Sequence, residues 1–372
     1  MCPMKLEQLL KGANEWVQTE GPQNRIVLSS RVRMARNLRQ HAFPGWAKKA
    51  ERQRALELLR PVIEGLPEMA DCFSELMDNI AAIDKQTLVE RHLISREHAV
   101  KNVGSGVIVS ASGVISVMIN EEDHLRMQAI HAGFQIKEAF NLIDRVDTEL
   151  EKQLEYAFSP RLGYLTACPT NIGTGMRASA MVHLPGMVLS DQINQIIQAV
   201  NKLGLAVRGL YGEGTEAMGN MFQVSNQTTL GEREADIIER LNKVVLQIIE
   251  HEESARLTLL EKKPKLIYNH IGRAYGILTN AHTVASKEAL NLLSLLRLGV
   301  DLELLPAATR AVVDELFVLA QPAHIQKFAA RKLTTEERDI LRADLIRGRL
   351  AVMPKPKIGR VPPQAQGNDP IE

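Results

Sequence analysis

Residues 168–179 contain the densest group of side chains that could take part in chemistry, since they read Cys-Pro-Thr-Asn-Ile-Gly-Thr-Gly-Met-Arg-Ala-Ser. The segment offers a thiol at Cys168 and a fixed positive charge at Arg177. Pro169 disfavours a regular helix, and the two glycines allow backbone angles that a side chain would forbid. We therefore expect a tight loop that holds an anionic ligand beside a reactive group. The same composition is also typical of an ordinary surface loop.

Arginines form a second candidate group directly after the apolar, strand-like residues 25–30. On an extended strand Arg31 and Arg33 lie on the same face, so two guanidinium groups can point at one ligand. Arginine is permanently charged, and its planar group binds phosphate through two parallel hydrogen bonds. A solvated cationic edge is the alternative interpretation.

Two carboxylates are candidates for proton transfer. Glu122 belongs to an acidic segment, 120–123, that follows a predicted hairpin of strands 106–110 and 114–119. We expect Asn120 to cap a long helix reaching residue 158, where acidic residues complement the helix dipole. The same placement would hold Glu122 ionised, as a catalytic base requires. Glu213 stands between two glycines. This pattern usually marks only a turn, but the flexible glycine backbone would also allow an exposed carboxylate to lie close against a ligand.

Length and composition limit the class of protein. The chain has 372 residues, enough for two domains, with 45% hydrophobic and 24% charged residues, as in ordinary soluble proteins. A net charge of +1 argues against a protein-wide surface for polyanions, so we expect no direct nucleic-acid binding. The three cysteines cannot form a disulfide framework, and the sequence shows neither a secretory leader nor a long apolar span. We therefore expect a cytoplasmic protein without a membrane anchor.

Four segments resemble, in the same order, the signature segments of the phosphagen (ATP:guanido) kinases. They are Ser-Ser-Arg-Val-Arg at 29–33, Asn-Glu-Glu-Asp-His-Leu-Arg at 120–126, Cys-Pro-Thr-Asn-Ile-Gly-Thr at 168–174 and Arg-Gly-Leu-Tyr-Gly-Glu at 208–213. The later part of the chain, with Arg-Asp-Ile-Leu-Arg-Ala at 338–343, is similar to the bacterial protein-arginine kinases.

The resemblance implies an α+β fold, in which a largely antiparallel sheet flanked by helices is followed by an all-helical C-terminal domain. The apolar patterns predict helices over 47–59, 69–83, 190–203 and 231–253, strands over 206–210 and 221–224, and only helices from 266 to 350. We expect an N-terminal segment (1–24), a catalytic domain (25–258), a helical domain (259–350) and a flexible tail (351–372).

The resemblance also implies ATP and Mg²⁺ as cofactors, although the sequence has no GxxxxGK[ST] phosphate loop. Glu122 and Glu213 occupy the family's two carboxylate positions, and Cys168 matches its reactive cysteine. No protein metal ligand is assigned. The implied nucleotide-binding residues are Ser29, Ser30, Arg31, Val32, Arg33, His92, Arg126, Arg177, Ala178, Ser179, Ala180, Met181, Arg208, Gly209, Leu210, Tyr211, Gly212 and Glu213.

The implied activity is the phosphorylation of arginine side chains in proteins, which would mark proteins for degradation under stress. The helical domain that precedes the first signature segment in animal phosphagen kinases is not matched here, where 28 residues precede Ser29. That difference favours a guanidinium presented on a protein. A kinase for free arginine or another small guanidino compound remains one alternative, and a nucleotide-sensing regulatory protein with a partner-binding C-terminal part is another. Expected partners are proteins with exposed arginines, an activator protein, protease or chaperone machinery, phosphoarginine, and further copies of the chain.

The last candidate site lies on a predicted helix that begins near Thr334. Arg338 and Arg342 are four residues apart and so share one helix face, with Asp339 beside them. A solvated face with surface ion pairs is the plain interpretation. The resemblance instead implies a phosphoarginine pocket made by Arg338, Asp339, Arg342 and Ala343, through which the enzyme would be activated by its product.

Overall fold

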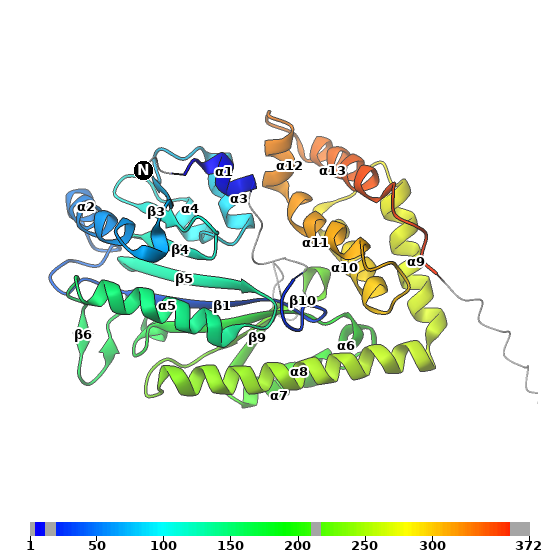
Figure 1. Ribbon diagram of the computed structural model, residues 1–372, viewed down its shortest axis with the longest axis horizontal. Helices are drawn as coiled ribbons and strands as arrows, with labels where there is room; N and C mark the ends of the chain where they lie inside the picture. The colour runs from blue at the N-terminus through cyan, green and yellow to red at the C-terminus, as the bar shows by residue number, and fades with distance from the viewer. Residues whose placement is uncertain (1–3, 12–19, 210–216, 358–372) are drawn as a thin grey trace, which may run out of the picture.

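The computed structural model describes residues 4–11, 20–209 and 217–357, and its centre is an eight-stranded sheet (Figure 1). Each pair of neighbouring strands is antiparallel. In sheet order the strands are β2 (Phe73–Leu76), β3 (Gly106–Val109), β4 (Ile115–Ile119), β5 (Leu125–Ala132), β1 (Val27–Arg36), β8 (Met176–His183), β10 (Met221–Asn226) and β9 (Leu205–Gly209). Strands β6 (Phe158–Ser159) and β7 (Gly163–Tyr164) form a separate small hairpin.

Helices account for most of the remaining described chain. Those before the long helix are α1 (Leu6–Lys11), α2 (Lys49–Glu64), α3 (Ala82–Glu90), α4 (Arg96–Ala99), α5 (Ile136–Glu151), α6 (Pro185–Leu189) and α7 (Ile193–Lys202). The long helix and its successors are α8 (Glu234–Lys262), α9 (Pro264–Asn280), α10 (Ser286–Asp301), α11 (Thr309–Leu319), α12 (Pro322–Phe328) and α13 (Thr335–Leu350).

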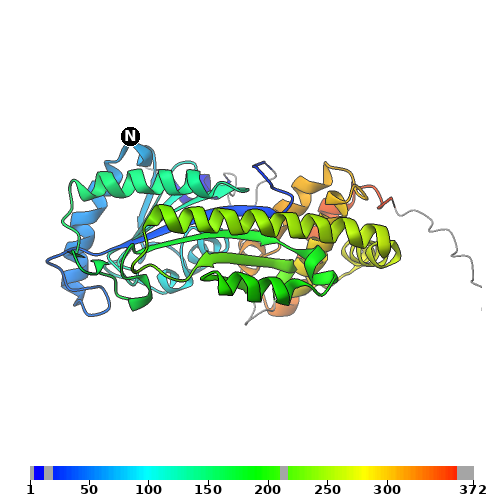
Figure 2. The ribbon, with the colours of Figure 1, turned by 90° about the horizontal axis from the view of Figure 1, so that it is seen from below.

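Helices α5 and α8 lie side by side across one face of the sheet (Figure 2). Val32 and Met34, which alternate with arginines on β1, point into the core beneath them. Burial of this apolar stripe is what holds the two layers together. The α5 side chains in that core recur every three or four positions and are Ile136, Ala139, Ile143, Val146 and Leu150.

The opposite face of the sheet carries two groups of helices, which meet where α12 packs against α3 and Lys327 pairs with Asp84. Helices α1 and α3 pack over β2, β3 and β4, where Val107 and Met118 join their core. The helices from α9 to α13 pack at the other end, where Leu28 and Met181 belong to the helical core. Polar side chains of β1, β5, β8 and β9 line a cavity on this face, so the site is built directly on the sheet.

Four local predictions are wrong. Residues 125–132 form strand β5 instead of the start of a long helix, because Leu125, Met127 and Ala129 alternate into the core with period two. Asn120 lies in the β4–β5 turn with φ of 57°, and is not a helix cap. The stretch 69–83 contains strand β2, and the predicted loop ends early because β8 begins at Met176.

Other elements are confirmed. The predicted hairpin is β3–β4, and α7, β9 and β10 lie within a few residues of their expected positions. The long helix α8 begins near the expected residue but ends at Lys262, nine residues beyond the predicted end at 253. The described part of the chain from 264 to 350 has helices and no strands. The expected division after residue 258 falls inside α8, shortly before that helix ends at Lys262. No described helix combines the length and the apolar character needed to cross a membrane.

Candidate active site

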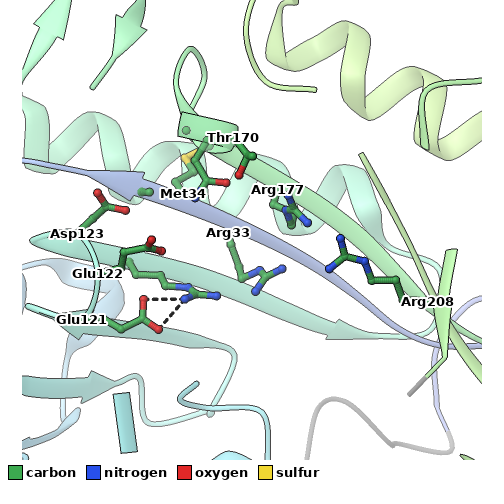
Figure 3. A pocket seen from close by; sticks show the side chains of 12 residues that line it. Arg33, Met34, Glu121, Glu122, Asp123, Thr170, Arg177 and Arg208 are labelled. Atoms are coloured by element: carbon green, nitrogen blue, oxygen red, sulfur yellow. Dashed lines mark hydrogen bonds and ion pairs between the residues drawn. The ribbon is translucent and has the colours of Figure 1, made fainter. Parts of the chain in front are cut away.

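Four arginines from four strands line one cavity of about 290 Å³ (Figure 3). Arg33 comes from β1, Arg126 from β5, Arg177 from β8 and Arg208 from β9. We call this space the arginine-lined cavity. Its remaining lining residues are Met34, Ala35, Glu121, Glu122, Asp123, Thr170, Asn171 and Gly175.

Strand register brings these cations together. Arg33 lies directly opposite Arg177 in the β1–β8 ladder, and Ala35 lies opposite Arg126 in the β1–β5 ladder. Opposed residues on antiparallel strands have Cβ atoms about 5 Å apart, and like charges at that spacing repel each other. The fold therefore accepts an electrostatic cost at this position, which an anionic ligand would remove.

The arginines have too few carboxylate partners. Burial, followed by the charges of Arg31, Arg126 and Arg177, holds the pKa of Arg33 well below its usual value. Burial and Arg208 likewise lower the pKa of Arg177. Among the described residues, neither Arg177 nor Arg208 has an ion-pair partner, and the buried Nε of Arg33 has no hydrogen-bond partner. The cavity therefore has the excess positive charge that a triphosphate requires.

Arg126 differs because Glu121 neutralises it. Its Nη1 lies 2.6 Å from both carboxylate oxygens of Glu121, which is itself buried. This pairing outweighs burial and raises the pKa of Arg126, while it lowers the pKa of Glu121. Asp123, on the same turn, accepts hydrogen bonds from Asn37 and Ala167. Of the three carboxylates that line the cavity from this turn, Glu122 is therefore the one available to a ligand (Figure 3).

Glu122 sits on a turn that the structure fixes firmly. Asn120 donates through Nδ2 to the carbonyl oxygens of Arg52 at 2.8 Å and Gly104 at 2.6 Å. Burial, followed by the neighbouring charges of Asp123 and Glu121, raises the pKa of Glu122 above its usual value. A rigid carboxylate with a raised pKa is a stronger proton acceptor than an ordinary surface glutamate.

Cys168 lies in the loop before β8 and is partly exposed. Its Sγ lies 3.0 Å from Thr170 Oγ1. The cavity is lined by Thr170 and Asn171, whereas Cys168 stands just outside the lining set. The expected tight loop is confirmed at Gly175, where φ is 62° and a Cβ atom would lie 2.6 Å from the carbonyl oxygen of Ala35.

The structure separates the other expected nucleotide residues into two groups. Arg31 donates to Gln223 Oε1 at 3.2 Å. Burial, followed by the charges of Arg31 and Arg33, lowers the pKa of the half-buried His92 to about 3. These two residues adjoin the cavity without lining it. The other motif members are buried and do not line the cavity: Ser29, Ser30, Val32, Ala178, Ser179, Ala180 and Met181. Val32, Ala178 and Ala180 belong to the core beneath α5 and α8, whereas Met181 belongs to the helical core on the face that carries the arginines.

Ser30 shows why a motif residue can be structural. Its hydroxyl donates to the carbonyl oxygen of Gly133 at 2.8 Å and accepts from the backbone N–H of Gln135 at 2.9 Å. The serine therefore ties β1 to the connection between β5 and α5. Gly209 ends β9, while Leu210, Tyr211, Gly212 and Glu213 lie outside the described residues.

Sequence reasoning missed Glu121 as the partner of Arg126, and Thr170 and Asn171 as lining residues. The missed pairing of Glu121 followed from the wrong helix over 125–132, since only a strand brings Arg126 back beside the turn. Alternation of Leu125, Met127 and Ala129 was the signal that could have revealed it.

The C-terminal candidate residues are close together, but one of them is already engaged. Arg342 is buried and donates to the carbonyl oxygens of Ala320 at 2.7 Å and Val284 at 2.8 Å, and it also pairs with Asp339. Arg338 is partly exposed and donates to Thr335 Oγ1 at 3.1 Å, and Ala343 is packed in the helical core. Arg342 therefore ties α13 to the end of α11 and to the connection between α9 and α10, in addition to pairing with Asp339.

Comparisons with known proteins agree with this geometry. Residues 64–255 match the family model described as ATP:guanido phosphotransferase, C-terminal catalytic domain, and residues 264–360 match the protein-arginine kinase McsB C-terminal domain. A protein-arginine kinase of Halothermothrix orenii is 44% identical over 350 residues, covering 93% of this chain and 99% of the relative. One from Brevibacillus brevis is 46% identical over 342 residues, covering 91% and 96%.

Solved structures with a similar fold include two phosphagen kinases. Lombricine kinase aligns with a TM-score of 0.55 and 25% identity over 68% of this chain and 71% of its own. The duplicated taurocyamine kinase of Schistosoma mansoni, with bound transition state analog components, aligns with a TM-score of 0.57 and 25% identity over 68% of this chain and 36% of its own.

Proposed function

The chain belongs to the protein-arginine kinases, a group of ATP:guanido phosphotransferases, and from this premise we propose that it transfers the γ-phosphoryl group of ATP to arginine side chains of proteins. The observation that carries the proposal is the convergence of Arg33, Arg177 and Arg208 with Glu122 in one cavity. Phosphoryl transfer is catalysed mainly by positioning and by neutralising charge, and this cavity offers both.

The arginine-lined cavity would hold the phosphate groups of ATP. Arg33, Arg177 and Arg208 supply the unneutralised cations, and Arg126 is kept in place by Glu121. ATP would enter as its Mg²⁺ complex, in which the metal neutralises phosphate charge. Nucleotide-bound Mg²⁺ usually keeps several waters and is held by phosphate oxygens with one or two carboxylates, and Glu122 and Asp123 line this cavity. Among the described residues, no group of three or more His, Cys, Asp or Glu side chains suited to a metal ion is found.

Glu122 would orient the acceptor guanidinium and receive its proton. An arginine guanidinium is protonated at ordinary pH, so its nitrogen attacks only when a base takes the proton. The new bond joins that nitrogen to the γ-phosphorus, the bond to the ADP oxygen breaks, and the proton passes to the carboxylate. We assign the second carboxylate to Glu213 and a supporting role beside the guanidinium to Cys168.

We further propose that Arg338, Asp339, Arg342 and Ala343 bind phosphoarginine and thereby activate the enzyme. Residues 25–258 would form the catalytic domain and residues 259–350 the helical one. The same proposal includes a cytoplasmic location and a role in marking proteins for degradation under stress. It also includes an activator protein, protease or chaperone partners and self-association. The match of residues 264–360 to the C-terminal domain of this family supports the helical domain in this proposal.

The test is to incubate the protein with γ-labelled ATP and either an unfolded protein or free arginine. We expect label on protein arginine, recognised as phosphate that is lost in acid and retained in base. Label on free arginine alone would refute the proposed acceptor, and absence of label on both would refute the activity.

A further inference from the structure

A second recess lies on the other side of Glu122. It has a volume of about 630 Å³, against about 290 Å³ for the arginine-lined cavity, and shares Glu121, Glu122 and Arg126 with it. Because the two spaces meet at Glu122, a guanidinium held there has the phosphates on one side and this recess on the other. We call it the Trp46 recess, lined by Gly45, Trp46, Glu97, Lys101, Glu121, Glu122, Arg126 and Ala167.

Trp46 is unusual because 90% of it is exposed while its loop is fixed. The backbone N–H groups of Trp46 and Ala47 donate to the carbonyl oxygen of Phe43 at 2.8 and 2.9 Å. The Phe43 ring in turn meets the ring of His124 edge to face, with centroids 6.3 Å apart. An aromatic side chain presented on an ordered loop can be covered by a partner at little entropic cost.

The charged residues that line the recess favour the binding of a positively charged group near Glu122. Glu97 lies close enough to add to the raised pKa of both Glu122 and Arg126. Arg126 is already neutralised by Glu121, so the charges left are those of Glu97 and Glu122 against the single cation Lys101. The carboxylates suit a guanidinium, and Trp46 at the rim suits an apolar neighbour.

We propose that the Trp46 recess receives the polypeptide that flanks the acceptor arginine, with the indole of Trp46 packed on an apolar side chain next to that arginine. This inference rests on the proposed function and specifies its substrate as an exposed segment in which arginine adjoins an apolar residue. Free arginine would fill the end at Glu122 and leave the indole uncovered. Trp46 is thus a specificity-determining residue.

The kinetic test compares two peptides that differ only beside the single arginine, one with leucine and one with glycine. In the wild type we expect a lower KM for the leucine peptide. Trp46→Ala should raise that KM about tenfold, as for truncation of an aromatic anchor, and largely remove the preference. Leu257→Ala, on α8 and 66% exposed, is the matched control and should keep wild-type values. Equal KM values for both peptides in wild type and variant would overturn the inference.

A binding test avoids dependence on catalysis. Trp16→Phe leaves Trp46 as the one indole, since the sequence has two tryptophans. Without ATP, the leucine peptide should shift Trp46 emission to shorter wavelength in a saturable way, and free arginine should not. An unchanged spectrum at peptide concentrations above KM would refute the inference. A normal shift together with no phosphorylation of any peptide would instead contradict the proposed function and leave the recess supported.

Discussion

Asp123 Oδ1 accepts a hydrogen bond of 2.6 Å from the backbone N–H of Ala167 and thereby joins the turn that carries Glu122 to the loop that carries Cys168. The same oxygen accepts from Asn37 Nδ2 at 2.6 Å, at the end of β1. One carboxylate oxygen thus sets the relative positions of three segments around the cavity. Asp123 therefore positions the segments of Glu122 and Cys168 without having to contact the substrate itself.

Asp123→Ala should destabilise the protein and lower kcat, because the buried side-chain amide of Asn37 and the partly buried backbone N–H of Ala167 lose this acceptor. Loss of the acceptor of a buried donor costs about 1 to 3 kcal/mol. Thermal unfolding measures the first effect and peptide phosphorylation the second. Asp123→Asn is the matched control, since its amide oxygen can still accept both bonds, and it should retain most of the stability. Equal unfolding temperatures for the alanine variant and the wild type would contradict this role.

Activity should fall as pH falls through the raised pKa of Glu122. The base must be deprotonated, and burial with the charges of Asp123 and Glu121 keeps it protonated to a higher pH than an ordinary glutamate. Asp123→Asn removes one of those charges, so the acidic limb of kcat/KM should move to lower pH. A limb that stays in place would show that another group controls it.

Glu122→Gln should abolish transfer while ATP affinity stays nearly unchanged, because glutamine keeps the shape but accepts no proton. Glu213→Gln, in the part of the chain that the structure does not describe, should behave in the same way. Steady-state turnover and calorimetric titration with ATP separate the two properties. Near-normal turnover in either variant would remove that residue from the mechanism.

Arg177→Ala should have opposite effects on the free protein and on the nucleotide complex. Removing a cation that faces Arg33 across the β1–β8 ladder relieves repulsion, so the free protein should gain up to about 1 kcal/mol of stability. ATP binding should weaken and turnover should fall by roughly 10³-fold, by analogy with other arginines that neutralise a transferring phosphoryl group. Thermal unfolding with and without ATP measures both effects. A variant that is less stable in the free state and binds ATP with unchanged affinity would contradict the role of Arg177 in phosphate binding.

Substitutions of Arg342 and Asp339 in the C-terminal site should have different effects, one on stability and the other on activation. Arg342→Ala should destabilise the helical region by about 1 to 3 kcal/mol for each buried carbonyl left unpaired at Ala320 and Val284. Asp339→Ala should remove stimulation by added phosphoarginine while basal transfer persists. Phosphoarginine calorimetry and activation assays measure this difference, and undiminished stimulation in Asp339→Ala would contradict the proposed sensor.

The sequence alone determined the candidate chemistry and much of the secondary structure. Alternation placed Arg31 and Arg33 on one face of a strand, the Ala-Ser-Gly turn predicted the hairpin, and the apolar period from residue 231 predicted the long helix. These features depend on residues close together in the chain. The signature segments then indicated which residues belong to a kinase-like site. The sequence did not show which of these residues are in contact.

Only the tertiary structure decided which of those residues meet. Arg33 opposes Arg177 because β1 pairs with β8, which lies 140 residues later in the chain, and Arg126 meets Glu121 because 125–132 is a strand. Ala178 and Ala180 belong to the same motif as Arg177, yet they face the core, since neighbouring positions on a strand point to opposite sides. Arg342, which the sequence placed on one helix face with Arg338, is buried by segments around Val284 and Ala320. Strand pairing and helix packing depend on long-range burial, and that is why local sequence patterns leave them open.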